Sequence, residues 1–129
     1  MPTTRLTPQN FEIVSGNDKR INVTVLDEDD VPVDITGAVI VWAVSATNRN
    51  KSRIFTYTSP TNITIILPQT GLDIGKFRID VQNGDTEPLS PTKSKRDYYH
   101  EARMVSSGGQ RSTVMIGTMT VLRNIIDIL

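Results

Sequence analysis

The chain has 129 residues, in which fourteen Lys and Arg residues balance fourteen Asp and Glu residues, and it contains no cysteine. This length predicts one domain with a single hydrophobic core. The balanced charge argues against nucleic acid as a primary partner, and the lack of cysteine excludes disulfides, thiolate nucleophiles and Cys-ligated metal sites.

The sequence contains no segment that predicts a secretory signal or a membrane span. Its first residues, MPTTRLTPQN, lack the apolar run of a signal peptide. The longest apolar stretch, residues 38–44, is far shorter than a helix that crosses a bilayer. We therefore expect a soluble protein that is made in a cytoplasm and has no membrane partner.

The N-terminal region predicts an extended arm that leads into strands. Residues 1–10 carry prolines and threonines without any periodicity, which is typical of an arm. A first strand is expected over residues 11–14. A second strand is expected where Ile21, Val23 and Val25 alternate with polar residues, because this is the period of a half-buried strand.

An acidic run follows this strand and predicts a hairpin turn, because Asp is poor in sheets and good in turns. Several carboxylates within one turn could also bind a hard cation such as calcium, but the glycine and the distal glutamate of the EF-hand pattern are missing. We favour the turn and expect no metal and no other cofactor. The run consists of Asp27, Glu28, Asp29 and Asp30.

The middle of the chain predicts the core. Residues 38–44 are continuously apolar, as expected for a central strand that is covered on both faces or for a strand that crosses the core, and Trp42 is the expected core anchor. Further strands are expected over residues 53–58, 62–67 and 75–81. The regular spacing of short strands and turn signals is typical of a β-sandwich or a small barrel.

The C-terminal half predicts a long surface loop over residues 82–97, followed by two strands over residues 98–105 and 112–122 that form an antiparallel hairpin. No amphipathic helix of ten or more residues is expected. The last residues are apolar, and a monomer would expose them. The predicted organisation is an arm at residues 1–10, a sandwich domain at residues 11–123 and a tail at residues 124–129.

His100 is the only histidine, so a serine hydrolase triad would have to include it. It lies in the middle of a predicted strand, and the chain has no Gly-x-Ser-x-Gly nucleophile elbow. We therefore interpret His100 as a structural residue whose ring, if buried, binds a backbone carbonyl or a hydroxyl.

A basic cluster, Lys93, Lys95 and Arg96, lies in the predicted loop and could bind a phosphate or an acidic partner. Charges in a loop are more often simply solvated. The cluster also lacks the interleaved aromatic residues that stack on bases, so nucleic acid is not an expected partner.

Four parts of the chain form a characteristic series: INVTVLDEDDVPVDITGA at residues 21–38, GKFRIDV at 75–81, Asp85, Thr86 and Leu89, and YYHEARMV leading to STVMIGTMTVL. This series resembles the small immunoglobulin-like structural proteins of tailed bacteriophage virions, including the N-terminal domain of baseplate upper proteins. The resemblance covers most of residues 11–122. In such proteins the next strand is usually entered through Pro-Val-Asp-Leu-Thr-Gly-Ala, where this chain has Ile35 in place of leucine.

The resemblance implies an immunoglobulin-like antiparallel β-sandwich of about seven to nine strands and a structural role in a virion that is assembled in the host cytoplasm. It supplies no catalytic residues, and we expect a protein that is not an enzyme. Its expected partners are capsid, neck or tail proteins and further copies of itself in a symmetric assembly. The residues expected to make these contacts are Thr3, Thr4, Arg5, Leu6, Lys93, Lys95, Arg96, Ile125, Ile126, Ile128 and Leu129.

A carbohydrate- or receptor-binding sandwich is the alternative from another functional class. In that case Trp42, Tyr57 or Tyr99 would present an exposed ring to a sugar. The chain has one Trp, three Tyr and three Phe residues, and its core needs most of them, which argues against this alternative.

Overall fold

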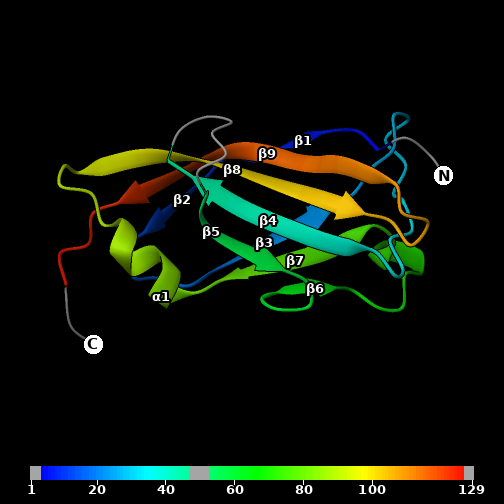
Figure 1. The fold of residues 1–129 in the computed structure, drawn as a ribbon, viewed down its shortest axis with the longest axis horizontal. Coiled ribbons are helices and arrows are strands. Elements are labelled where there is room, and N and C mark those ends of the chain that lie inside the picture. The colour runs from blue at the N-terminus through cyan, green and yellow to red at the C-terminus, as the bar shows by residue number, and fades with distance from the viewer. Residues whose placement is uncertain (1–3, 47–52, 127–129) are drawn as a thin grey trace.

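The computed structural model describes residues 4–46 and 53–126. In these residues the chain folds as an all-β sandwich of two facing sheets, as the sequence predicts (Figure 1). The larger sheet has the strand order β1-β9-β8-β4-β5, with β2 also paired to β9, and the smaller sheet has the order β3-β7-β6. The strands are β1 (Thr7–Pro8), β2 (Phe11–Val14), β3 (Lys19–Thr24), β4 (Val39–Ser45), β5 (Arg53–Thr58), β6 (Ile63–Ile65), β7 (Lys76–Val81), β8 (Lys95–Val105) and β9 (Arg111–Leu122).

The smaller sheet forms because its strands alternate apolar and polar residues. In the pair β3 and β7, Ile21 lies opposite Ile79 and Val23 lies opposite Phe77. All of these side chains are buried in the core. The residues between them point to the other face of the sheet, as the period of a half-buried strand requires. The predicted alternating strands are therefore confirmed.

β4 is an interior strand of the larger sheet, between β8 and β5, and Trp42 anchors the core there, as predicted. Trp42 is 0% exposed, and its ring centroid lies 5.6 Å from that of Phe55 and 5.4 Å from that of Tyr57. The alternate residues Val41 and Ala43 remain partly exposed. The continuous apolar sequence of β4 is thus not covered on both faces, because no further layer packs on the outer face of this sheet in the described part of the chain.

The N-terminal arm contributes strands to the larger sheet, which differs from the expectation of an arm that ends where the sandwich begins. β1 and β2 both run parallel to β9, with Thr7 opposite Met115 and Phe11 opposite Met119. The strand predicted over residues 11–14 is confirmed. The sandwich is antiparallel except at this edge, where the backbone groups of β9 that do not face β8 bind the arm.

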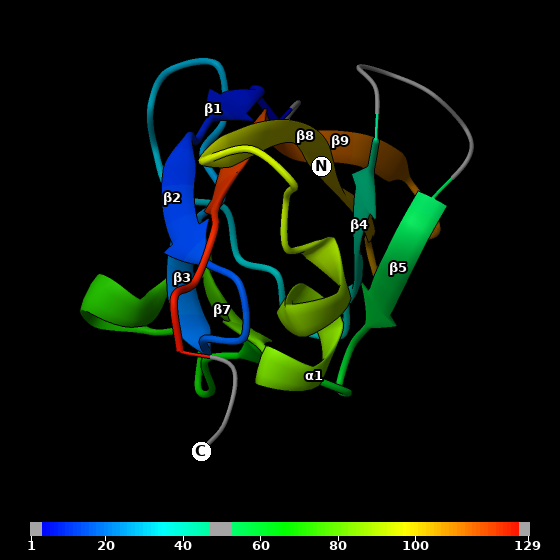
Figure 2. The same ribbon diagram turned by 90° about the vertical axis from the view of Figure 1, so that its left-hand side faces the viewer.

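The segment over residues 82–97, which was predicted as a surface loop, is instead compact and partly buried. It contains the helical turn α1 (Asn83–Thr86) and the 3₁₀ turn η2 (Glu87–Leu89), and a second 3₁₀ turn, η1 (Gly71–Asp73), precedes β7. Figure 2 shows α1 and the segment after it lying across one end of the sandwich, where Thr86 and Leu89 are buried. None of the helical elements in the described residues is long and apolar enough to span a membrane.

Candidate interaction surfaces

The predicted contact residues of the arm lie mainly against the body of the same chain. Thr4 and Arg5 are half-buried because both bind the segment around the acidic turn. Leu6 is exposed, and Thr3 lies outside the described residues. Thr4 forms a β-bridge with Asp27, and Arg5 binds the carbonyl of Leu26 through its backbone N–H and the carboxylate of Asp30 through its guanidinium.

A buried histidine holds the arm in place. His100 is 0% exposed, and its Nε2 lies 2.7 Å from the backbone carbonyl oxygen of Gln9. The indole N–H of Trp42 donates to Nδ1 of His100 at 3.1 Å. Because an indole can only donate, Nδ1 accepts, so Nε2 carries the proton and donates to Gln9. The prediction of a structural histidine that binds a backbone carbonyl is confirmed.

The close approach of the arm to β9 depends on Gly117. A Cβ atom at this position would lie 1.8 Å from the carbonyl oxygen of Gln9 and 2.8 Å from Nε2 of His100. Neither distance is compatible with a side chain, so only glycine lets the arm reach His100 here. A glycine in a strand can indicate such an approach, but the sequence alone does not identify which backbone comes close.

The environment of His100 disfavours its charged form. Burial lowers the pKa of His100 below its ordinary value, and the hydrogen bond to the carbonyl of Gln9 offsets this effect only in part. A neutral imidazole with both nitrogens bonded inside the protein holds its neighbours together.

Acid is therefore expected to destabilise the fold through His100. As the pH falls through about 6.5, the unfolded chain binds a proton on this histidine before the folded chain does. The free energy of unfolding should then decrease by up to about 1.4 kcal/mol per pH unit until the folded-state pKa is reached. Urea unfolding at several pH values tests this, with His100→Asn as the control.

The difference in unfolding free energy between the wild type and His100→Asn should shrink as the pH falls. Protonation of carboxylates changes the stability of both chains equally and cancels in this difference, which leaves only the effect of His100. A difference that is constant from about pH 7.5 to 5 would contradict the assignment of a neutral, buried imidazole.

The basic cluster lies only partly in a loop. Lys93 is an exposed loop residue, whereas Lys95 and Arg96 are the first residues of β8, which corrects the prediction that all of them lie in a loop. The guanidinium of Arg96 lies over the ring of Tyr98, 5.0 Å from its centroid. The strand fixes the backbone of Lys95 and Arg96, whose side chains point to opposite faces of the sheet, whereas Lys93 stays in the loop before the strand.

The start of the C-terminal tail is the most exposed apolar segment in the described part of the chain. Ile125 is 95% exposed and Ile126 is 63% exposed, as the sequence predicts for a monomer. The chain before them is fixed, because Asn124 donates to the carbonyl oxygen of Ser15 at 3.1 Å. Ile128 and Leu129, which belong to the same predicted contact, lie outside the described residues.

The acidic run forms the predicted hairpin turn. The carboxylate of Asp27 accepts hydrogen bonds from the backbone N–H groups of Asp29 at 2.8 Å and Val31 at 3.0 Å. Asp30 has a φ of 62°, a left-handed conformation that Asp tolerates in turns, and its carboxylate pairs with Arg5. In the described ranges, no group of three or more His, Asp and Glu side chains could hold a metal ion.

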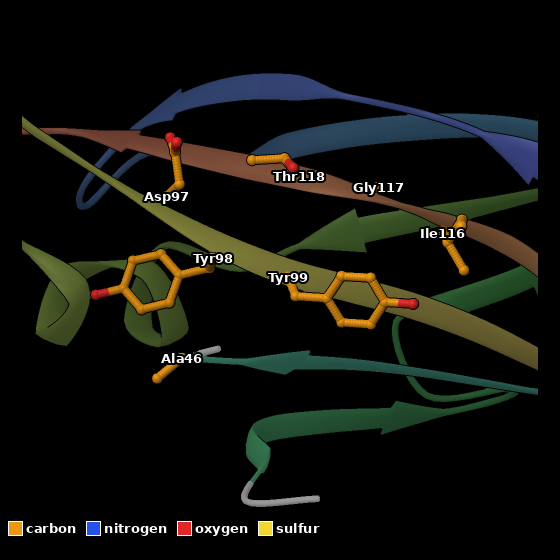
Figure 3. A pocket seen from close by; sticks show the side chains of 7 residues that line it. All are labelled: Ala46, Asp97, Tyr98, Tyr99, Ile116, Gly117 and Thr118. Atoms are coloured by element: carbon orange, nitrogen blue, oxygen red, sulfur yellow. The ribbon is translucent and has the colours of Figure 1, made fainter. Parts of the chain in front are cut away.

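A hollow opens on the outer face of the larger sheet (Figure 3). Its volume is about 360 Å³, within the range of small-ligand sites. The rings of Tyr98 and Tyr99 point away from each other there (Figure 3), and the hydroxyl of Tyr99 donates to Glu101 at 3.2 Å. The hollow is lined by Ala46, Asp97, Tyr98, Tyr99, Ile116, Gly117 and Thr118.

The aromatic residues proposed for sugar binding are mostly buried. Trp42 and Tyr57 are core residues, so neither presents an exposed ring. The hydroxyl of Tyr57 donates to Asp85 at 2.6 Å, and burial together with this contact raises the pKa of Tyr57. Tyr99 is the one residue of the predicted set whose ring lines the hollow.

No protein-family model matches the chain, and no curated protein matches it.

Gln69 is a buried structural residue that the sequence did not predict. The side-chain amide of Gln69 is buried, and its oxygen accepts hydrogen bonds from the backbone N–H of Ile35 at 3.1 Å and of Gly75 at 2.7 Å. Its nitrogen donates to the carbonyl oxygen of Ile66 at 2.7 Å. This amide joins the segment after the acidic turn to the segment around η1. A single glutamine in a turn-rich sequence gives no pattern that would predict it.

Proposed function

We propose that this chain is a non-enzymatic structural protein of a tailed bacteriophage virion. It serves as a connector, decoration, neck, tail or baseplate subunit that is assembled in the host cytoplasm and binds neighbouring virion proteins, including further copies of itself. The observation that carries the proposal is the apolar tail, which leaves a well-packed sandwich with Ile125 and Ile126 exposed. A fully buried isoleucine contributes about 1.5–3 kcal/mol. A neighbouring protein that covers this tail would therefore gain a binding free energy of this size for each isoleucine that it buries.

The chemistry of the interior supports a structural role. The only histidine is buried and bonded at both ring nitrogens, which leaves it unsuited to act as a general base on an external substrate. The arm, by contrast, is bound to its own sheet, so its residues contribute mainly to the stability of the subunit. A contact through the exposed tail, weak between two subunits, becomes stronger in total when it repeats in a symmetric assembly.

Deleting residues 125–129 is expected to reduce incorporation of the protein into particles at least tenfold, because the apolar contact with the neighbour is lost. The unfolding free energy should change by less than about 0.5 kcal/mol, since Ile125 and Ile126 are exposed in the fold. Incorporation is measured by quantifying the chain in purified particles, and unfolding by urea titration. Leu72→Ser is the matched control at a second exposed apolar position.

Normal incorporation of the tail-deleted chain would show that the tail is not the contact. If the Leu72→Ser control lost incorporation while the tail deletion did not, the contact would lie at the opposite end of the sandwich.

A carbohydrate-binding sandwich is the second candidate function, and the hollow beside Tyr99 is the observation that favours it. A ring next to carboxylate and hydroxyl groups can stack on a sugar and bind its hydroxyls. Binding on a glycan array that is lost in Tyr99→Ala would support this function. An array without hits would leave only the structural role.

A further inference from the structure

The N-terminal arm, with strands β1 and β2, binds a site that the rest of the chain provides. The backbone carbonyl oxygen of Gln9 accepts the N–H of His100 at 2.7 Å, and the side-chain oxygen of Asn10 accepts the backbone N–H of Thr118 at 2.9 Å. Gly117 leaves the space in which the backbone of Gln9 lies. These groups and the open edge of β9 are here called the arm site. Every copy of the chain carries the same arm site.

The arm can leave the arm site without disturbing the other strands. β9 pairs with β8 along its whole length, from Arg111 opposite Val105 to Leu122 opposite Lys95. The arm lies on the other side of β9, and in the described part of the chain no further strand pairs with it (Figure 1). Departure of the arm therefore breaks only the bonds of the arm itself. It also uncovers a strand edge whose backbone groups favour a new strand partner.

A short hinge, residues 15–18, connects the arm to β3. Thr86 is one of the side chains that hold this hinge, because its hydroxyl accepts the backbone N–H of Gly16 at 3.0 Å and donates to the carbonyl oxygen of Asn17 at 3.0 Å. The hydroxyl of Ser15 is buried in the hinge and has no hydrogen-bond partner among the described residues. A buried hydroxyl without a partner is unfavourable, so opening of the hinge would relieve this cost.

The hinge decides whether an arm binds its own chain or another copy. In a pair of chains that have exchanged arms, each arm makes the same contacts with β9 as in the single chain, so only the hinge differs. Opening the hinge loses the bonds to Thr86 and brings the hydroxyl of Ser15 to water. A fully extended hinge of four residues spans about 13 Å, which lets the arm reach a neighbouring body.

We infer that two copies of this chain exchange their N-terminal arms, so that Gln9 of each copy binds His100 of the other. The arm of a second copy is the occupant because residues 7–14 of this same sequence are the segment that the arm site binds in the structure. The inference goes beyond the proposed function, which assigns the contact with neighbours to the tail. It concerns the free chain and does not depend on a virion role.

Paired cysteine variants of the full chain test the inference, because the wild type contains no cysteine. Glu12 lies opposite Thr120 in the parallel pair of β2 and β9. Neighbouring strands lie about 4.8 Å apart, which suits the Cα separation of about 4.4–6.8 Å in disulfides. Glu12→Cys and Thr120→Cys are prepared as separate chains, mixed at high concentration, oxidised and separated on a denaturing gel without reductant.

Exchange predicts disulfide-linked pairs of chains in this mixture. Each carries a bond between positions 12 and 120, which mass spectrometry of the digested pair identifies. A mixture of Glu12→Cys with Thr58→Cys is the matched control, because Thr58 is exposed on β5 at the other edge of the larger sheet. The first mixture should give at least about tenfold more linked pairs than the control, because the arm site holds the two thiols together.

A chain with both Glu12→Cys and Thr120→Cys tests the register of the arm. At high dilution it should form the disulfide within one chain, since the closed arm places both positions side by side. This bond should then prevent exchange until it is reduced.

Thr86→Val tests the role of the hinge. Valine has nearly the shape of threonine but cannot bond to Gly16 or Asn17, so the closed hinge loses support that the open hinge does not use. Introduced into both chains of the mixture, this substitution should raise the yield of pairs linked between positions 12 and 120 by about three- to tenfold. Thr56→Val, at an exposed position of β5, is the matched control and should leave the yield unchanged.

The inference is overturned if the double variant closes within single chains while the mixture gives only the control level of linked pairs at every concentration. Linked pairs joined at other positions would overturn it as well, and so would a yield that Thr86→Val does not raise. Incorporation into particles is measured separately. A chain that exchanges arms in solution but never enters particles would support the inference and reject the proposed function.

Discussion

Replacing Gly117 with alanine is expected to destabilise the fold by about 2–4 kcal/mol and to release the N-terminal arm. The added Cβ would lie 1.8 Å from the carbonyl oxygen of Gln9, which is backbone and cannot move aside as a side chain could. The arm must then leave β9, and the hydrogen bond between His100 and Gln9 is lost with it. Urea unfolding measures the loss of stability, and limited proteolysis measures release of the arm.

Gly84→Ala is the matched control for this substitution. No atom lies within 4 Å of a Cβ at Gly84, which sits in α1, so this variant should be as stable as the wild type or slightly more stable. If Gly117→Ala were as stable as Gly84→Ala and its arm resisted proteolysis, the contact between the arm and β9 would not exist as described.

Replacing Trp42 with alanine is expected to cost about 3–5 kcal/mol, a large part of the 5–15 kcal/mol that stabilises a typical domain. The indole is 0% exposed and packs against Phe55, Tyr57 and His100. Its loss also leaves Nδ1 of His100 without the donor that fixes the tautomer. Thermal and urea unfolding give the size of the effect.

Trp42→Phe keeps the prediction testable if the alanine variant does not fold. Phenylalanine retains most of the apolar contacts but cannot donate to His100, so a loss of about 1–3 kcal/mol is expected. Ile54→Ala on the edge strand β5 is the control and should change stability by no more than about 0.5 kcal/mol. A Trp42→Phe variant with wild-type stability would show that the indole hydrogen bond contributes nothing.

The sequence predicted those parts of the fold that depend on local pattern. Ile21 and Val23 in β3, and Phe77 and Ile79 in β7, alternate with polar residues, and each strand lies within one or two residues of its predicted position. The acidic turn and the buried Trp42 followed from residue preferences in the same way. Such patterns report which face of a strand is buried.

The parts that were not predicted depend on contacts between residues far apart in the sequence. The pairing of β1 and β2 with β9 joins segments from opposite ends of the chain, and no periodicity indicates which edge an arm will bind. The burial of Thr86 and Leu89 depends on the end of the sandwich that they cover. The contact surfaces were predicted only as exposed segments, because the segments that come together on the surface depend on the topology.

Locating the chain in purified particles tests the central claim of a virion structural role most directly. The measurement is quantitative mass spectrometry of particles from the phage that, under the proposed function, encodes the chain, with the copy number referred to the major capsid protein. The proposal predicts that the chain is present at a fixed copy number consistent with a symmetric ring or shell. Particles that are complete and infectious without the chain, or a copy number that falls to zero on purification, would contradict it.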